Sequence, residues 1–265
     1  MKVKLLLFVF ACGLGHAQGQ TWNLIWSDEF NGTTIDNTKW THELGTGNWG
    51  WGNNELQYYT ASTNNSFVSN SELHILAKEQ VINTSNYSSA RLITKNKFSF
   101  QYGKVEGRLK APAGQGLWPA FWMMPQSNVY GGWASSGEID IMEARGRLVN
   151  EATGAIHYGG NWPNNVYQSG KQTFSYGEGI DTFHVYAVEW TDTSIKWYYD
   201  DILVWEATEW FTEGHAFPAP FDESFFMILN LAVGGHFDDH ILPADSIFDE
   251  AVVMIVDYVR VYQFE

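Results

Sequence analysis

The sequence predicts an all-β protein, folded as an antiparallel β-sandwich. Segments in which apolar and polar residues alternate recur along the chain, which is typical of strands that bury one face. Turn-forming residues separate these segments, and helical periodicity is scarce. With 265 residues and no linker, low-complexity tract or internal repeat, the chain is expected to carry a single domain.

Six strands are predicted from alternation alone. In chain order they span residues 105–110, 183–190, 195–199, 202–206, 225–233 and 252–262. Between the third and the fourth, Asp200 and Asp201 predict a tight hairpin turn, because aspartate tolerates the left-handed conformation that glycine usually fills.

A further strand-like segment, residues 137–143, carries three carboxylates among apolar neighbours. In an extended strand Glu138 and Asp140 point to one face, because side chains alternate with period two, and Glu143 falls out of phase. One extra residue at Ile141 and Met142, accommodated as a β-bulge, would return Glu143 to the same face. Unpaired buried carboxylates are costly, so we interpret this row of three acids as a functional site.

Three carboxylates in a row suit the cleavage of a glycosidic bond. One carboxylate attacks the anomeric carbon while another, kept protonated, donates to the leaving oxygen, and retention of configuration needs the pair about 5–5.5 Å apart. Close like charges cannot all be ionised, so the middle acid helps a neighbour to keep its proton. A Ca²⁺-binding or salt-bridged strand is the alternative, but neither requires the nearby tryptophans Trp118, Trp122, Trp133 and Trp162. Spacing alone does not separate the role of Glu138 from that of Glu143.

The motif Glu-Ile-Asp-Ile-Met-Glu at residues 138–143 resembles the catalytic motif of glycoside hydrolase family 16, in the longer, bulged form typical of laminarinases. Residues 49–59, 116–123 and 230–235 are similar to segments of the endo-β-1,3-glucanase branch of that family, and the resemblance covers the chain from about residue 22 to residue 264. It implies a jelly-roll sandwich with a concave substrate cleft. It also implies Glu138 as the nucleophile, Asp140 as its electrostatic helper and Glu143 as the general acid/base, with no cofactor for catalysis.

Aromatic sugar contacts are expected around the acids. Trp118 and Trp122 lie four residues apart with Pro119 between them, so we predict a strand that places both rings on one face, not a helix. Such rings would form a stacking wall for sugars, with core packing as the alternative. Trp133, in a glycine-rich loop, is expected to cover a neighbouring subsite.

Four polar residues are further candidates for substrate binding. The resemblance implies that Asn53 and Arg91 hydrogen-bond sugar hydroxyls, with loop structure or a salt bridge as the alternative for both. His157 lies on the strand that should follow the acid segment, where it could contact the sugar or the acid/base, or be structural. Asn230, at the end of an apolar strand, is a candidate of the same kind.

A structural Ca²⁺ site is also implied by the resemblance, away from the acid row. Its ligands would be Glu29, Ser71 and Asp257, which supply carboxylate and carbonyl oxygens of the type that a hard cation prefers. The loop position is usually glycine in the family and is Ser71 here, where the backbone carbonyl can still serve. Ordinary surface acids are the alternative.

The first 17 residues resemble a signal peptide. Lys2 and Lys4 precede an apolar run at residues 5–14 and the small-residue site Gly15-His16-Ala17, so residues 18–265 would form the secreted catalytic domain. A rival interpretation is a lipoprotein processing site at residues 9–12, with a lipid anchor on Cys12. Cleavage after Ala17 would remove this sole cysteine, so disulfides are not expected to hold the fold. No second hydrophobic segment is long enough to cross a bilayer.

The chain is strongly acidic, with 30 acidic and 15 basic residues and a net charge of −15. Removal of residues 1–17 takes two lysines with it and makes the net charge −17. A polyanion such as nucleic acid or a sulfated polysaccharide would be repelled, whereas a neutral glucan is compatible. Acidity that serves solubility alone is the other interpretation. The chain also has 13 Trp, 13 Tyr and 17 Phe, more aromatic residues than a core of this size usually requires.

We therefore predict a secreted, monomeric, retaining endo-glycosidase that hydrolyses internal β-1,3 linkages of a laminarin-type β-glucan. Within the enzyme interpretation, a mixed-linkage β-1,3-1,4-glucanase, an agarase and a transglycosylase are alternatives. A non-catalytic glucan-binding protein of the same fold is the alternative from another class, although such a protein need not keep all three acids.

Overall fold

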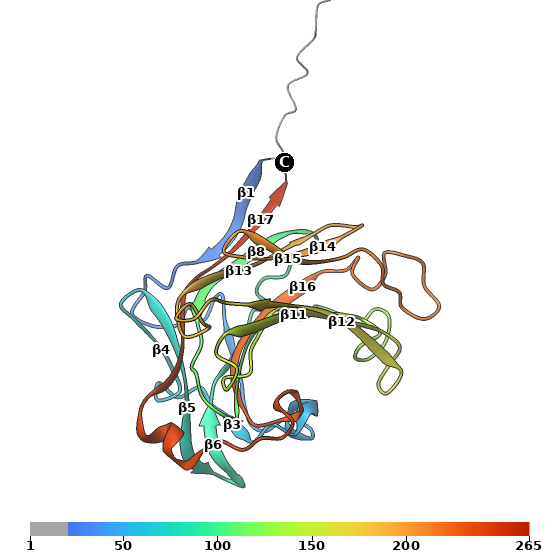
Figure 1. Ribbon diagram of the computed structural model, residues 1–265. Coiled ribbons are helices and arrows are strands. Elements are labelled where there is room, and N and C mark those ends of the chain that lie inside the picture. The colour runs from blue at the N-terminus through green and yellow to red at the C-terminus, as the bar shows by residue number, and fades with distance from the viewer. Residues whose placement is uncertain (1–20, 265) are drawn as a thin grey trace, which may run out of the picture.

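The computed structural model describes residues 21–264, which form two curved β-sheets lying against each other (Figure 1). In this part of the chain the outer sheet has ten strands and the inner sheet has seven. Every strand pair is antiparallel except the short pair of β3 and β6. The predicted antiparallel β-sandwich is confirmed. The predicted signal peptide and Cys12 lie outside the described residues, and no helix within residues 21–264 is long and apolar enough to span a membrane.

The outer sheet runs in the order β15-β14-β13-β8-β17-β5-β6-β3, with β1 beside β17 and β4 beside β5. Its strands are β1 (Trp22–Asp28), β3 (Gln57–Tyr59), β4 (Ser66–Ser69), β5 (Glu72–Ile82), β6 (Ser85–Ser89), β8 (Gly103–Lys110), β13 (His184–Trp190), β14 (Ile195–Tyr199), β15 (Ile202–Ala207) and β17 (Val252–Phe264).

The inner sheet runs in the order β12-β11-β10-β9-β16-β7-β2. Its strands are β2 (Thr41–Glu43), β7 (Arg91–Ile93), β9 (Leu117–Pro125), β10 (Glu138–Glu143), β11 (Glu151–Gly159), β12 (Asn165–Thr173) and β16 (Phe225–Val233). Short helical turns lie in the loops at η1 (Gly50–Asn54), η2 (His236–Asp238) and η3 (Asp245–Asp249).

The six strands predicted from alternation are present as β8, β13, β14, β15, β16 and β17, with ends that differ by at most two residues. The predicted hairpin turn between β14 and β15 is also confirmed, because Asp200 and Asp201 have φ angles of 49° and 63°. The local sequence was sufficient to predict these elements. Each strand buries one face, which gives the alternation, and the turn has residues that tolerate a positive φ angle.

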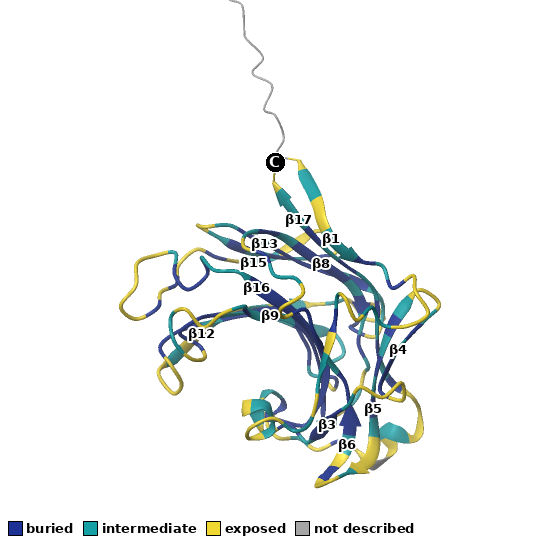
Figure 2. Cartoon of the chain, turned by 180° about the vertical axis from the view of Figure 1, so that it is seen from behind, coloured by how far each residue is buried: buried dark blue, intermediate teal, exposed yellow. Residues whose placement is uncertain are grey.

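The hydrophobic core fills the space between the two sheets, and the exposed residues gather in the loops and on the outer surfaces (Figure 2). Large aromatic side chains from the outer sheet, including Trp190, Trp197, Tyr186 and Tyr199, are almost completely buried in it. From the inner sheet, Phe121 and Met123 of β9 and Ile139 of β10 point into the same core. Because strand side chains alternate, the residues between them face the other way, onto the concave face of the inner sheet.

The predicted β-bulge lies in β10 at Ile141 and Met142. Asp140 pairs with Ala155 of β11 and Glu143 pairs with Thr153, so two residues of β10 stand opposite Gly154 alone. Both bulge residues are fully buried in the core. A Cβ atom at Gly154 would lie 2.2 Å from Trp197 Cδ1, so only glycine leaves room for that indole.

Two outer-sheet side chains satisfy the backbone of β10 at the bulge. Trp197 Nε1 donates to the carbonyl oxygen of Asp140 at 2.7 Å, and the Tyr199 hydroxyl donates to that of Ile141 at 3.0 Å. Buried carbonyl groups that a bulge takes out of the strand ladder need such partners. The core therefore fixes the shape of the strand that carries the acids.

Candidate active site

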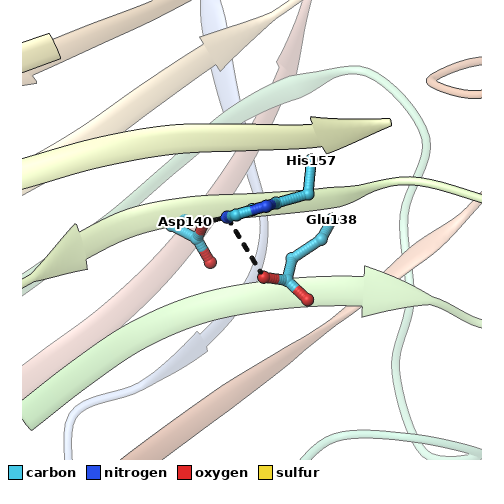
Figure 3. Close-up of side chains that lie close together, drawn as sticks. All are labelled: Glu138, Asp140 and His157. Atoms are coloured by element: carbon cyan, nitrogen blue, oxygen red, sulfur yellow. Dashed lines mark ion pairs between the residues drawn. The ribbon is translucent and has the colours of Figure 1, made fainter. Parts of the chain in front are cut away.

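The three predicted acids lie together on the concave face, on β10 in the middle of the inner sheet. Asp140 is only 2% exposed, Glu143 is buried and Glu138 is partly exposed. His157 of β11 is the direct cross-strand partner of Glu138. Figure 3 shows its imidazole ring turned toward two of the acids, with Nε2 3.7 Å from Glu138 Oε1 and 3.4 Å from Asp140 Oδ2.

Glu138, Asp140 and His157 form the one group of acidic and imidazole ligands, among residues 21–264, that is close enough to hold a metal ion. His157 Nδ1 is buried without a hydrogen-bond partner within that range, and Asp140 Oδ2 is buried with His157 Nε2 3.4 Å away. Burial lowers the pKa of His157, but a hydrogen bond to Asp140 and the charges of the three acids outweigh it and raise the pKa to about 10. A protonated imidazole has no free lone pair, so a metal ion at this group would have to displace the proton of His157, which is ion-paired with Glu138 and Asp140.

Each outer glutamate of the row accepts a hydrogen bond from a tryptophan. Trp133 Nε1 donates to Glu138 Oε2 at 2.7 Å, and Trp118 Nε1 donates to Glu143 Oε1 at 2.9 Å. The predicted positions of both tryptophans beside the acids are therefore found in the structure. Trp118 is only 9% exposed and its ring stacks on Phe237, so its indole N–H group holds Glu143 while most of its surface is covered.

The environment raises the pKa of both outer glutamates. Burial, followed by the charge of Asp140, raises the pKa of Glu138 to about 7. The same two causes, in the same order, raise the pKa of Glu143 well above its usual range. His157 and the indole donors act in the opposite direction on both carboxyls. A buried row of this kind cannot ionise completely, so it holds at least one proton near neutral pH.

The predicted residues Arg91 and Trp122 lie beside each other on β7 and β9. The Arg91 guanidinium lies over the Trp122 ring at 4.8 Å and over the Trp51 ring at 4.6 Å. Its Nε is 2.6 Å from Glu43 Oε2 on β2. Stacking and ion pairing hold this arginine in one orientation, as a polar recognition residue requires.

Asn230 of β16 belongs to a chain of hydrogen bonds beneath this arginine. Its Oδ1 accepts from Trp122 Nε1 at 2.7 Å, and its Nδ2 donates to the Tyr59 hydroxyl at 3.0 Å. The Tyr59 hydroxyl donates to buried Glu55 Oε2 at 3.1 Å, and the side chain of Asn53 also hydrogen-bonds Glu55. The predicted residues Asn230 and Asn53 therefore belong to one hydrogen-bond network, which reaches Trp122 through Asn230.

Sequence reasoning missed Tyr167, an exposed aromatic residue on the other side of the acid row, and named Trp162 only as a nearby tryptophan. Tyr167 of β12 pairs with His157 in register, stacks on it at 5.7 Å and is 66% exposed. Trp162 is also exposed, and its backbone N–H donates to the carbonyl oxygen of Trp133 at 2.9 Å. The register of β11 against β12 places Tyr167 near the acids, and a single strand pattern does not reveal that register.

The three residues expected to bind Ca²⁺ lie on segments that converge at the outer sheet. The turn at Ser71 joins β4 to β5, Leu73 of β5 pairs with Val256, and the end of β1 pairs with Val259. The oxygen donors suit a hard cation. However, both carboxylate oxygens of Glu29 accept from Arg260 at 2.8 and 2.9 Å, and Asp257 Oδ2 accepts from Arg108 at 2.6 Å. Binding through the Asp257 carboxylate would require it to release Arg108, and the calcium site stays a prediction.

A curved sandwich with a row of acids and tryptophans on its concave face defines a glycoside hydrolase of the all-β class. The chain matches the model of glycosyl hydrolases family 16 over residues 53–234. It belongs to that family, so the resemblance seen in the sequence is confirmed.

Individual relatives agree with this assignment. The chain is 47% identical over 261 residues to glucan endo-1,3-β-glucosidase A1 of Niallia circulans, and the match covers 91% of this chain but only 38% of that protein. It is 40% identical to glucan endo-1,3-β-glucosidase of Cryptopygus antarcticus, covering 88% and 86% of the two chains. Among solved structures, the laminarinase from Rhodothermus marinus has a TM-score of 0.82 and 36% identity, covering 94% of this chain and all of that one.

Proposed function

We propose that the protein is a retaining endo-glucanase that hydrolyses internal β-1,3 linkages of a laminarin-type β-glucan. The observation that carries this proposal is the row of Glu138, Asp140 and Glu143, in which each outer glutamate has its own indole donor and the middle acid faces an imidazolium. The names of the relatives, glucan endo-1,3-β-glucosidase and laminarinase, support the choice of substrate.

In the first step, the ionised carboxylate of Glu138 attacks the anomeric carbon and protonated Glu143 donates its proton to the leaving glycosidic oxygen. The product is a covalent glycosyl ester on Glu138. In the second step, Glu143 takes a proton from water as the water attacks the same carbon, which releases the sugar with retained configuration. The chain's own side chains supply both proton transfers and the nucleophile.

Asp140 and His157 set the charges that these two steps need. Asp140 raises the pKa of Glu143, which favours the protonated acid before the first step. The imidazolium of His157 faces Glu138 and lowers the pKa of that carboxyl, which favours the ionised nucleophile. Each neighbour acts in the same direction on both carboxyls, but the pKa of Glu143 is raised well above its usual range and that of Glu138 only to about 7, so Glu143 is the acid that keeps its proton.

Endo attack is supported by sugar-binding groups on both sides of the acids. Arg91, Trp122 and Asn230 lie toward β7, whereas Trp133, His157 and Tyr167 lie toward β12. A polysaccharide could therefore contact the concave face before and after the bond that is cleaved. Several sugars would bind at once, and internal bonds would be cut in preference to chain ends.

The test is a product profile on laminarin, lichenan, agarose and carrageenan. A spread of oligosaccharides early in the digestion of laminarin is expected, whereas an exo enzyme releases one short product from the outset. Faster hydrolysis of lichenan would favour the mixed-linkage alternative. No cleavage of laminarin together with rapid cleavage of agarose or carrageenan would refute the glucan assignment.

We also propose that the enzyme acts outside the cell as a monomer, with residues 1–17 removed or with a lipid on Cys12. The mass of the mature chain distinguishes these forms, because the lipidated form keeps Cys12 and gains the acyl mass. Light scattering on the mature protein measures its oligomeric state.

A further inference from the structure

The loop at residues 234–240 follows β16 and contains η2. The backbone N–H of Gly234 donates to the carbonyl oxygen of Gly116 at 2.8 Å, which ties the start of the loop to the start of β9. Farther along, His236 Nε2 lies 2.9 Å from Asn54 Nδ2. Nothing in the mechanism above uses this loop, yet one residue of it is the most deeply buried carboxylate among the described residues.

That carboxylate is Asp238, which is 0% exposed. Its Oδ1 accepts a hydrogen bond from Arg147 Nε at 2.7 Å and lies 3.8 Å from Arg145 Nε. Arg145 Nε also donates to the carbonyl oxygen of Phe237 at 2.7 Å. Both arginines come directly after β10, the strand that ends at Glu143. A buried charge is tolerated only with such partners, so this ion cluster fastens the loop to the end of the acid strand.

The loop returns to the acid row through Phe237. Its ring stacks on that of Trp118, with centroids 5.0 Å apart and an angle of 23° between the planes. The Arg145 guanidinium lies over the Phe237 ring at 4.2 Å. Trp118 Nε1 in turn donates to Glu143 Oε1. A continuous set of contacts therefore leads from Asp238 through Phe237 and Trp118 to Glu143.

We propose that Asp238 is a positioning residue for the acid/base: by holding Phe237 against Trp118, it keeps the indole N–H group of Trp118 on Glu143 Oε1. The proposal rests on the proposed function only in taking Glu143 as the acid/base. None of Asp238, Arg147 and Phe237 need contact the sugar. The role of the cluster is to fix one rotamer of one indole.

Fixing this indole decides which oxygen of Glu143 carries the proton. An oxygen that accepts an N–H bond does not readily hold an O–H group facing the same donor, so the proton is directed to Oε2. Oε2 is then the oxygen that donates to the leaving group. If Trp118 were free to turn, the proton would be shared between both oxygens and fewer substrate complexes would be ready to react. The indole bond also lowers the pKa of Glu143, so its loss should raise that pKa.

The test compares two neighbouring aspartates with the same change. Asp238→Asn removes the buried charge, whereas Asp239→Asn removes an 80% exposed charge of the same loop that lies 3.6 Å from Arg147 Nη2, so it tests the loss of a surface charge beside the same arginine. Phe237→Leu is the second variant, because it breaks the stacking while Asp238 keeps its partners. Rates are measured on laminarin and on 2,4-dinitrophenyl β-laminaribioside. Departure of the 2,4-dinitrophenyl group needs little help from an acid.

Asp238→Asn and Phe237→Leu should lower kcat on laminarin by about tenfold with KM nearly unchanged, since general acid catalysis contributes about 10²–10⁴-fold and is only partly lost. The alkaline limb of the pH profile of kcat on laminarin should move to higher pH. The loss of kcat on the aryl substrate should be much smaller. Asp239→Asn should match the wild type. Equal losses on both substrates with an unmoved alkaline limb, or a folded Phe237→Leu variant with unchanged kcat, would overturn the proposal.

A measurement without turnover separates this proposal from the proposed function. The indole N–H of Trp118 should exchange with solvent at least tenfold faster in Asp238→Asn and Phe237→Leu than in the wild type and Asp239→Asn, as followed by NMR. Unchanged exchange in both loop variants would refute the positioning role. If the wild type cleaves no glucan, the proposed function fails, and this exchange experiment still decides whether Asp238 positions Trp118.

Discussion

His157 Nε2 lies 3.7 Å from Glu138 Oε1, and the two residues are direct partners across β11 and β10. The acids raise the pKa of His157 to about 10, whereas burial and Asp140 raise that of Glu138 to about 7. Between these two values the imidazole is charged and the carboxyl is ionised. In this range Glu138 has the ionised form that its proposed role as nucleophile requires.

Replacing His157 should move the acid limb of the pH profile. The imidazolium favours ionised Glu138, so His157→Gln raises the pKa of that carboxyl, and the acid limb of kcat/KM moves from about 7 to higher pH. His74→Gln is a matched control, because His74 Nε2 also lies 3.7 Å from a glutamate, Glu72, on the outer sheet. An unmoved acid limb in His157→Gln, or an equal shift in the control, would contradict the assigned role.

Removal of the nucleophile and of the acid/base should be distinguishable by rescue with azide. Glu138→Ala should reduce turnover of an activated glucoside by about 10⁴-fold or more, and azide should then give the inverted glycosyl azide. For Glu143→Ala, azide should give the retained product, because the covalent intermediate still forms. Product configuration is read by NMR. A product of retained configuration from the Glu138 variant would mean that Glu138 is the acid/base and Glu143 the nucleophile.

The variant Asp140→Asn should shift the alkaline limb. Asp140 is a like charge that raises the pKa of Glu143, so its neutralisation lowers that pKa and moves the alkaline limb of kcat to lower pH. The rate at the optimum should fall as well. Because the carboxyls titrate together, the limbs describe the row as a unit. A normal rate with an unchanged profile would mean that Asp140 has no part in the row.

The acid row should cost stability at neutral pH. Glu138 has a folded-state pKa of about 7 against 4.5 for an ordinary glutamate, so ionising it disfavours the folded state. This cost is absent below pH 4.5 and complete above pH 7. Glu138→Gln should therefore increase the free energy of unfolding at pH 8, on the order of 1–3 kcal/mol, with a smaller gain at pH 4. Urea unfolding at both pH values measures it, and an equal gain at both would argue against a charge effect.

Calcium should raise the melting temperature if Glu29, Ser71 and Asp257 bind it. At a calcium concentration a hundredfold above Kd, mass action stabilises the folded state by about 2.7 kcal/mol. Asp257→Ala should abolish the difference between calcium and chelator, whereas activity at low temperature should survive chelation. Arg108→Ala should strengthen the calcium effect, because it frees the Asp257 carboxylate. Identical melting curves in calcium and in chelator would contradict the predicted calcium site.

The sequence was sufficient for features that depend on neighbouring residues. The period of two and one inserted residue placed Glu138, Asp140 and Glu143 on one face, and paired aspartates marked the turn at 200–201. Strands β9 to β12 of the inner sheet pair in chain order, but β16, β7 and β2 do not, and no local pattern encodes that order or the register of β11 against β12. For this reason Tyr167 and Phe237 could be located only in the folded chain.

The ion pairs were missed for a related reason. Arg108 and Asp257 are far apart in sequence and meet because β8 lies beside β17, and Glu29 meets Arg260 because β1 lies beside the same strand. From sequence alone, a carboxylate that is paired with an arginine on the neighbouring strand cannot be distinguished from a metal ligand. The same limit applies to Asp238, whose partners come from the end of β10.

Gly154 of β11, opposite the bulge, is needed for the geometry of the acid row although it has no side chain. Any substitution there would push Trp197 away from the carbonyl group of Asp140, and the displaced bulge would turn Glu143 out of the row. In a saturation scan of this enzyme, position 154 should therefore be as intolerant as the acids themselves. An engineer who redesigns sugar preference can vary residues of the concave face that do not contact the acids, but has to treat this glycine as part of the reactive centre.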